Sequence, residues 1–233
     1  MFIVGVDLGQ SRDSTAIAII ERAEPAAPEA RRVDGILIQQ GEPLQPVYSL
    51  RHLERPALGT PYTLIVERVI ALLDMPPLDR FSAPLVLDKT GVGAAICDLF
   101  TQAGVRPRAL TITGGDRPNV ADPYDLRVPK RDLASTLVML FQTGRLRLAR
   151  GLPLVQALVD ELAAFQMKIN PITGNDSYEA WRESDHDDLV LAVAMSCWWL
   201  EQFVARQAQE PAYSTGKDRH VRVEQRRGYR PLG

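Results

Sequence analysis

The sequence predicts an α/β protein in which helices cover both faces of a mixed, five-stranded sheet. Two short apolar runs rich in β-branched residues, 2–9 and 15–20, flank a polar segment and predict an antiparallel hairpin. A third extended run at 33–40 predicts a third antiparallel strand after a Pro/Ala-rich connection. Beyond residue 60, strands alternate with helices, which is typical of parallel strands joined by helical crossovers.

The elements of the second part follow from periodicity and from helix-breaking residues. A helix begins at Thr60 or Pro61 and ends before Pro76-Pro77, because proline cannot donate the helical hydrogen bond. Residues 84–88 form a short apolar strand of the kind that is buried on both faces. We expect a helix at 91–103, a strand at 108–113, and three later helices at 130–141, 154–167 and 186–204.

The composition excludes several classes of protein. With 233 residues, 45% hydrophobic and 24% charged, the chain is close to the globular average and is neither disordered, collagen-like nor coiled-coil. Its longest uncharged apolar run, 189–200, is too short for a bilayer span of about 20 residues. The start of the sequence has no basic leader. We therefore expect a soluble, cytoplasmic protein that has no membrane partner.

The charge is unevenly distributed along the sequence. The net charge is −2, but residues 217–233 carry six basic and two acidic side chains, so this segment is near +4 and the rest is near −6. We expect one domain at 1–205 and a basic tail at 206–233. The tail either contacts DNA phosphates or is a solvated terminus. The candidate phosphate contacts are Lys217, Arg219, Arg222, Arg226 and Arg227.

Acidic residues occur at three points where a structural role alone explains them poorly. Asp7 lies inside an apolar strand, where a carboxylate is costly unless it is paired or bound to a cation. Gly5, on the same face, leaves room for another element. Asp88 ends the apolar strand 84–88, at the edge where ligands of α/β sheets collect. The third point is the trio Asp185, Asp187 and Asp188 around His186, which opens the most apolar helix.

Each point also has a structural interpretation. Asp7 can be satisfied by backbone amides, Asp88 can cap the next helix although Thr90 is better placed, and acids favour a helix N-terminus. If the last helix packs across the two strands, however, all three points converge and repel one another unless a cation lies between them. Oxygen ligands without a His/Cys cluster favour Mg²⁺ or Mn²⁺. Two such ions can activate a water molecule and stabilise the leaving oxygen in phosphodiester hydrolysis.

Three stretches, taken in order, resemble the nuclease domain of the large terminase subunit of tailed phages. They are VDLGQSRDSTAIAII, LVLDKTGVG and DHDDLVLAVAMSCWW. That family opens with an aspartate in strand one, followed by an acid ahead of a Thr-Ala pair; here these are Asp7, Asp13 and Thr15-Ala16. Its second acid precedes a T-G-x-G turn, as Asp88 does, and its third lies in an H-D-D segment, here 186–188. The resemblance covers residue 1 to about residue 204 and implies an RNase H-like fold related to RuvC-type resolvases.

The resemblance also implies an activity. It implies a two-metal-ion endodeoxyribonuclease that cuts concatemeric phage DNA during genome packaging in a bacterial host. Asp7 would bridge two Mg²⁺ or Mn²⁺ ions, Asp88 would hold one, and Asp188 or Asp187 would complete the set, with Asp188 favoured as the inner ligand. His186 and Lys89 are auxiliary candidates for contacts to a water or a phosphate, together with Asp13. The implied partners are double-stranded DNA, a packaging ATPase domain or subunit, the small terminase and the portal.

The sequence departs from a complete large terminase subunit in one respect, and three alternative functions stay open. The sequence lacks the G-x-x-x-x-G-K-[ST] motif of the packaging ATPase, so the chain is a separate domain, a separately encoded nuclease or a prophage remnant. A RuvC-like junction resolvase would use the same chemistry on branched DNA. A non-catalytic DNA-packaging accessory protein would keep only the fold. A phosphotransferase of the actin and sugar-kinase group would use Asp7-Leu8-Gly9 to grip phosphate.

Overall fold

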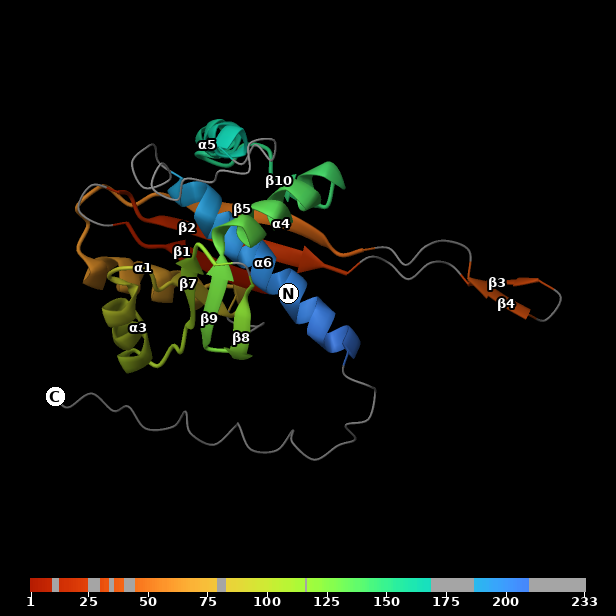
Figure 1. The fold of residues 1–233 in the computed structure, drawn as a ribbon, viewed down its shortest axis with the longest axis horizontal. Helices are drawn as coiled ribbons and strands as arrows, with labels where there is room; N and C mark the ends of the chain where they lie inside the picture. The colour runs from red at the N-terminus through yellow and green to blue at the C-terminus, as the bar shows by residue number, and fades with distance from the viewer. Residues whose placement is uncertain are drawn as a thin grey trace, which may run out of the picture. The chain divides into compact units, whose positions relative to one another are not determined.

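The computed structural model describes residues 1–9, 13–24, 30–33, 36–39, 45–78, 83–115, 117–168 and 187–209. The chain divides into two units, Met1–Leu200 and Glu201–Gly233, and the main sheet and the candidate site lie in the first. Figure 1 shows the strands and helices of the fold with their labels. Residues 206–209 of the predicted basic tail belong to the last helix, which runs from Asp188 to Gln209, and residues 210–233 lie outside the described residues. The domain boundary at 205 stays a prediction.

The main sheet has eight strands in the order β10-β5-β2-β1-β6-β7-β9-β8. The neighbours β5, β2 and β1 are antiparallel, whereas β6 and β7 continue parallel to β1. Three antiparallel strands followed by parallel ones are the arrangement expected from the sequence, and the predicted mixed α/β architecture is confirmed. The bounds are β1 (Phe2–Asp7), β2 (Ala16–Ala23), β5 (Val47–Glu54), β6 (Leu85–Asp88), β7 (Arg108–Thr113), β8 (Asn119–Asp122), β9 (Asp125–Pro129) and β10 (Leu146–Leu148).

The expectation of five strands, with the third at 33–40, was wrong. That stretch lies largely in a separate two-stranded antiparallel sheet of β3 (Ala30–Val33) and β4 (Ile36–Gln39). The third strand of the main sheet is β5. Its buried residues Tyr48, Leu50 and Leu53 do not alternate regularly, because the pairing with β2 shifts register between Ile19 and Ile20. A β-bulge of this kind hides the period of two by which a strand is recognised in a sequence.

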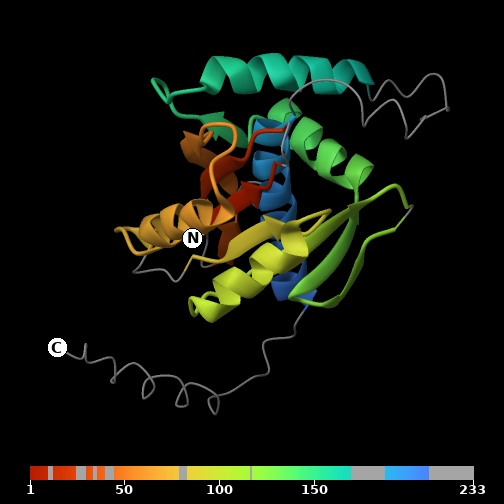
Figure 2. The ribbon, with the colours of Figure 1, turned by 90° about the vertical axis from the view of Figure 1, so that its left-hand side faces the viewer.

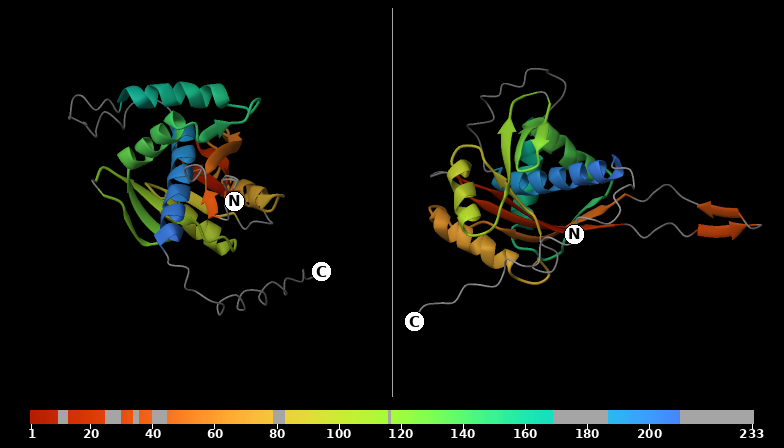
Figure 3. Two further views of the ribbon diagram at one scale, coloured as in Figure 1. Left: turned by 90° about the vertical axis from the view of Figure 1, so that its right-hand side faces the viewer. Right: turned by 90° about the horizontal axis from the view of Figure 1, so that it is seen from below.

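Helices cover both faces of the sheet, as expected. On one face, α1 (Tyr62–Leu73) and α3 (Gly93–Gln102) pack through buried apolar side chains against β1, β2 and β6. On the other face lies α6 (Asp188–Gln209), and Figure 3 shows the strands between these two layers. The remaining helices are α4 (Lys130–Gln142) and α5 (Val155–Lys168). Within the described ranges, no helix is both long enough and apolar enough to cross a membrane.

Gly5 allows α6 to lie directly on β1. A Cβ atom at Gly5 would come within 2.0 Å of Ser196 Oγ and 2.4 Å of the Ala192 carbonyl oxygen, distances that real Cβ atoms do not show. The Ser196 hydroxyl donates a hydrogen bond to that carbonyl at 2.9 Å. The prediction that Gly5 leaves room for another element is therefore confirmed, and that element is α6. This packing brings the start of α6 toward the ends of β1 and β6.

Candidate active site

Asp7 and Asp88 end two neighbouring parallel strands. Val6 pairs with Leu87 in the register of β1 and β6, so the two aspartates occupy the next position on each strand. Both residues are buried, with 7% of their surface exposed. The carboxyl ends of adjacent parallel strands are where ligands of α/β sheets bind. The structure thus brings together the first two acids that the sequence singles out.

The electrostatics of the pair is unfavourable for two ionised carboxylates. Burial raises the pKa of Asp7 well above its ordinary value of 3.8, and repulsion from Asp88, Asp187 and Asp188 raises it further. Burial also raises the pKa of Asp88, although hydrogen bonds from Thr90 and the charge of Lys130 oppose this shift. The direct contact between the two groups raises the pKa of Asp7 and lowers that of Asp88, so burial and repulsion together oppose ionisation of both carboxylates at once.

The turn after β6 fixes the Asp88 side chain. The Thr90 amide donates a hydrogen bond to Asp88 Oδ1 at 2.8 Å, and the Thr90 hydroxyl accepts one from the Ile112 amide at 3.1 Å. A Cβ atom at Gly93 would lie 2.1 Å from the Asp88 carbonyl oxygen, so the turn closes only with glycine there. Neither Asp88 nor Thr90 caps α3, which begins after Val92 without a side-chain cap. The capping interpretation of Asp88 is therefore wrong.

Asp187 and Asp188 lie at the start of α6, but the helix amides there are satisfied by another residue. Glu161 of α5 accepts hydrogen bonds through Oε2 from the amides of Leu189, at 3.2 Å, and Val190, at 3.4 Å. The Asp187 carbonyl accepts the first helical hydrogen bond, from Leu191. Asp188 still lies in the first turn, where a negative charge is favourable, but these two helix amides are bonded by Glu161.

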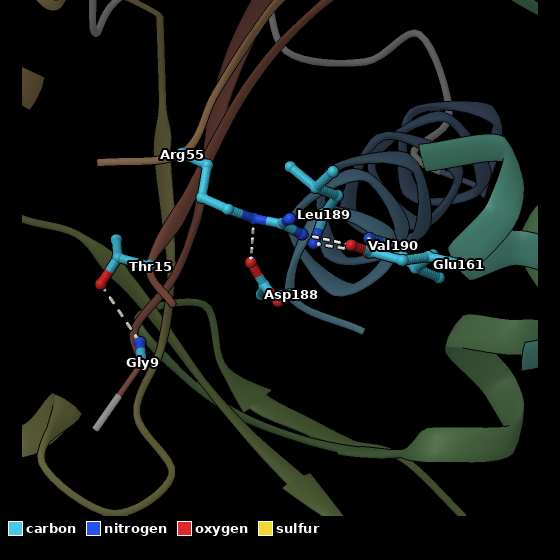
Figure 4. Close-up of polar contacts among 7 residues, drawn as sticks. All are labelled: Gly9, Thr15, Arg55, Glu161, Asp188, Leu189 and Val190. Atoms are coloured by element: carbon cyan, nitrogen blue, oxygen red, sulfur yellow. Dashed lines mark hydrogen bonds and ion pairs between the residues drawn. The ribbon is translucent and has the colours of Figure 1, made fainter. Parts of the chain in front are cut away.

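Two basic side chains reach these aspartates from other elements. Arg55, directly after β5, donates from Nε to Asp188 Oδ2 at 2.8 Å and also forms an ion pair with Glu161 Oε1. Figure 4 shows Arg55 between the two carboxylates. Lys130, the first residue of α4, donates from Nζ to Asp187 Oδ2 at 2.7 Å. The site therefore combines an acidic pair on the strands with two acids that are each neutralised by a cation.

The remaining candidates from the sequence lie at the edge of this arrangement or outside it. Lys89 forms an ion pair with Asp125 of β9 at 3.0 Å, and Asp13 is exposed. Gly9 lies near the beginning of the connection between β1 and β2, and Thr15 lies at its end. The Thr15 hydroxyl accepts a hydrogen bond from the Gly9 amide at 3.2 Å (Figure 4). His186 and the basic residues at 217–227 lie outside the described residues.

The arrangement of the acids is compatible with a divalent cation, but it does not form a complete metal site. In the part of the chain that the structure describes, no three His, Cys, Asp or Glu side chains are arranged to hold a metal ion. Asp7 and Asp88 supply hard oxygen donors, and their mutual repulsion is what a cation would relieve. Asp188 approaches Asp7 closely enough to raise its pKa, while its Oδ2 is held by Arg55. The set of metal ligands stays a prediction.

Sequence reasoning missed Arg55, Glu161 and Lys130. Arg55 is separated from Asp188 by 133 residues and from Glu161 by 106, and Lys130 lies 57 residues from Asp187. A single charged residue at the end of a strand or on a helix is typical of a solvated surface. Only the chain topology reveals that these three residues meet the acidic segment.

The fold and the site together define a mixed α/β domain with paired aspartates at the carboxyl ends of its central strands. Among solved structures, the chain is similar to the large terminase nuclease from the thermophilic phage G20c, with 17% identity over 84% of this chain and 80% of that one and a TM-score of 0.48. It is also similar to RuvC from Thermus thermophilus, with 15% identity over 89% and 96% of the two chains and a TM-score of 0.36. The Holliday junction resolvase of fowlpox virus follows at 12% identity, 88% and 99% coverage and a TM-score of 0.31.

The sequence by itself matches no protein-family model and no curated protein.

Proposed function

We propose that this chain is a metal-dependent endodeoxyribonuclease that cuts double-stranded DNA. The observation that carries the proposal is the pair Asp7 and Asp88, two buried carboxylates on adjacent strand ends whose charges repel. A protein retains such a costly pair when a ligand compensates it, and hard divalent cations are the ligands that carboxylates select. Two bound Mg²⁺ or Mn²⁺ ions would activate water and stabilise the leaving oxygen of a phosphodiester.

The chain's own residues supply the rigid frame for this chemistry. Asp7 lies close enough to Asp88, Asp187 and Asp188 for the charge of each to raise its pKa, so it is the natural shared ligand. Asp88 is oriented by the Thr90 amide, and Asp188 by Arg55. Side chains held in this way retain their geometry when substrate arrives, which is the condition for efficient positioning of the reacting groups. We propose Asp188 as the third metal ligand. Asp187, which accepts a hydrogen bond from Lys130, would lie outside the set of direct ligands.

The resemblance in sequence supports a narrower role for the proposed nuclease. We infer cleavage of concatemeric phage DNA during packaging, with an ATPase motor, the small terminase and the portal as partners. On this proposal the protein works in the cytoplasm of an infected or lysogenic bacterium. The motor must be supplied by another domain or subunit, because the sequence contains no P-loop.

Plasmid cleavage tests the proposal. Purified protein with Mn²⁺ or Mg²⁺ should nick or linearise supercoiled DNA, and EDTA should stop the reaction. Asp7→Asn and Asp88→Asn should each abolish cleavage while circular dichroism shows an intact fold. Asp74→Asn is the matched control, since Asp74 is an exposed aspartate at the end of α1 and should leave the rate unchanged. Full cleavage by either site variant would overturn the assignment.

The same preparation distinguishes the alternatives. Preference for a four-way junction over linear duplex would identify a RuvC-like resolvase. Absence of cleavage together with tight DNA binding would indicate an accessory protein. Binding of ATP in calorimetry, without any effect on DNA, would favour the phosphotransferase.

A further inference from the structure

Arg55 connects Asp188 to a second carboxylate on a different helix. Its Nε donates to Asp188 Oδ2 at 2.8 Å, and its terminal nitrogen forms an ion pair with Glu161 Oε1. The guanidinium group is planar and its donors have fixed directions, so it holds two carboxylates in a defined relative orientation. Figure 4 shows this chain of contacts from Asp188 through Arg55 to Glu161.

Glu161 in turn fixes the backbone from which Asp188 projects. Its Oε2 accepts hydrogen bonds from the amides of Leu189 and Val190, the two residues that follow Asp188. Figure 2 shows α5 crossing the end of α6 at which that helix begins. One carboxylate thus sets both the start of α6 and the position of the arginine that holds the Asp188 side chain.

These contacts are largely withdrawn from solvent. The side chains of Arg55, Glu161 and Asp188 are 22%, 10% and 5% exposed. Charge-assisted hydrogen bonds in such surroundings are only weakly screened by salt and restrict side-chain motion. The three groups come from the end of β5, from α5 and from α6, so the network joins three elements at the edge of the site.

We propose that Arg55 and Glu161 are positioning residues that hold Asp188 in the orientation required for divalent-cation binding. This inference rests on the proposed metal-dependent function. The hydrogen-bonded partners of ligating carboxylates typically contribute about 10–100-fold to metal affinity. Arg55 acts through Oδ2 of Asp188, and Glu161 acts through Arg55 and through the first turn of α6.

A simple electrostatic role for Arg55 predicts the opposite result. A guanidinium charge beside the site repels a divalent cation and competes for Asp188. Removing a mere counter-ion therefore tightens metal binding, whereas removing a positioning residue weakens it. The sign of the change in Mn²⁺ affinity separates the two roles, independently of catalysis.

The experiment is a Mn²⁺ titration by isothermal calorimetry on the full chain. Arg55→Gln should weaken Mn²⁺ binding by about 10–100-fold. Arg51→Gln is the matched control, because Arg51 lies on β5, the strand that Arg55 follows, is paired with Glu21 at 2.7 Å and is exposed. It should leave the affinity unchanged. Unchanged or tighter binding by Arg55→Gln overturns the inference.

Two further variants keep the test decisive if Arg55→Gln does not fold. Arg55→Lys keeps the positive charge but loses the planar fork, so binding should still weaken; wild-type affinity there contradicts positioning. Glu161→Gln keeps one acceptor oxygen, which cannot serve both Arg55 and the α6 amides as the carboxylate does, and it should also weaken binding. If the wild-type chain takes up no Mn²⁺, the proposed function fails, and this inference fails with it. If the wild type binds and the variants bind equally well, only the inference fails.

Discussion

At the scale of single residues, Asp7 bears most of the electrostatic cost of the site. It is buried and faces the negative charges of Asp88, Asp187 and Asp188. Asp7→Asn removes one of the repelling charges and keeps a donor for the hydrogen bond to Asp88. Without divalent cations at pH 7, we expect this variant to melt at least about 2–4 °C above the wild type, which corresponds to about 1 kcal/mol for a chain of this size. Differential scanning calorimetry in EDTA measures the shift, and a lower melting temperature would contradict it.

The raised pKa of Asp7 also predicts how stability depends on pH. Because the folded protein binds this proton more tightly than the unfolded chain does, the contribution is fully present below the ordinary pKa of 3.8 and is lost as pH rises through the folded-state pKa. The free energy of unfolding in EDTA should therefore decrease from about pH 4 upward, with a slope that Asp7→Asn reduces. Denaturant unfolding at several pH values tests this. Saturating Mn²⁺ should reverse the decrease, since the cation binds the ionised form.

The two adjacent aspartates of α6 should differ in importance. Asp188 is almost fully buried and is held by Arg55, whereas Asp187 is more exposed and is paired with Lys130. If Asp188 is the inner ligand, Asp188→Asn should reduce plasmid cleavage by far more than Asp187→Asn, about 100-fold against 10-fold or less. Equal losses in the two variants would contradict the assignment of Asp188 as the inner ligand. A larger loss for Asp187→Asn would reverse it. Single-turnover cleavage rates at saturating Mn²⁺ give the comparison.

Some site residues could be predicted from the sequence and others could not, for a physical reason. Asp7 and Asp88 stand out because an acidic side chain in an apolar strand is costly to bury unless it is paired or bound to a cation. Arg55 and Glu161 do not, since an arginine after a strand and a glutamate on a helix fit their local context. Their role depends on contacts between segments more than 100 residues apart, and a local pattern carries no information about such contacts.

At the scale of elements, the contact between β1 and α6 decides where Asp188 is placed. Gly5→Ala forces a Cβ atom against Ser196 Oγ and against the Ala192 carbonyl oxygen, at 2.0 and 2.4 Å. We expect a loss of about 1–3 kcal/mol in the free energy of unfolding, measured by denaturant titration. The double variant with Ser196→Ala should recover only part of the loss, because the backbone carbonyl remains in the way. Full recovery would show that the contact with the helix backbone is unimportant.

The elements also show which parts of a fold a sequence reveals. The hairpin of β1 and β2, the buried strand β6 and the helices were predicted because their apolar patterns are regular. The strand β5 was missed because its bulge breaks the alternation, and β8, β9 and β10 are short strands near the edges of the sheet. The stretch 33–40 contains β4, but β4 pairs with the preceding strand β3 and not with a strand of the main sheet. Extended conformation is thus predictable locally, whereas membership of a sheet depends on distant pairing.

At the scale of the whole molecule, the distribution of charge conflicts with a substrate as anionic as DNA. The chain outside residues 217–233 has a net charge near −6, and acids gather at the strand ends. Within the site, Arg55 and Lys130 are committed to aspartates. Bound divalent cations would reduce the local negative charge, but an additional source of positive charge is needed for affinity along the DNA backbone.

The basic tail is one part of the sequence that can supply it, because residues 217–233 carry six basic and two acidic side chains. Each lysine or arginine that neutralises a phosphate releases counterions, so the affinity for DNA falls with salt by a slope of about −0.9 per contact. Replacing five tail residues by glutamine in the full chain should weaken binding to duplex DNA and reduce the salt slope by several units, as measured by fluorescence anisotropy at 50–200 mM salt; the five are Lys217, Arg219, Arg222, Arg226 and Arg227. Arg51→Gln with Arg68→Gln is the control, because each of these arginines is already paired with a glutamate. An unchanged slope would mean that the tail is only a solvated terminus, and the phosphate contacts would then have to come from the domain that carries the aspartates.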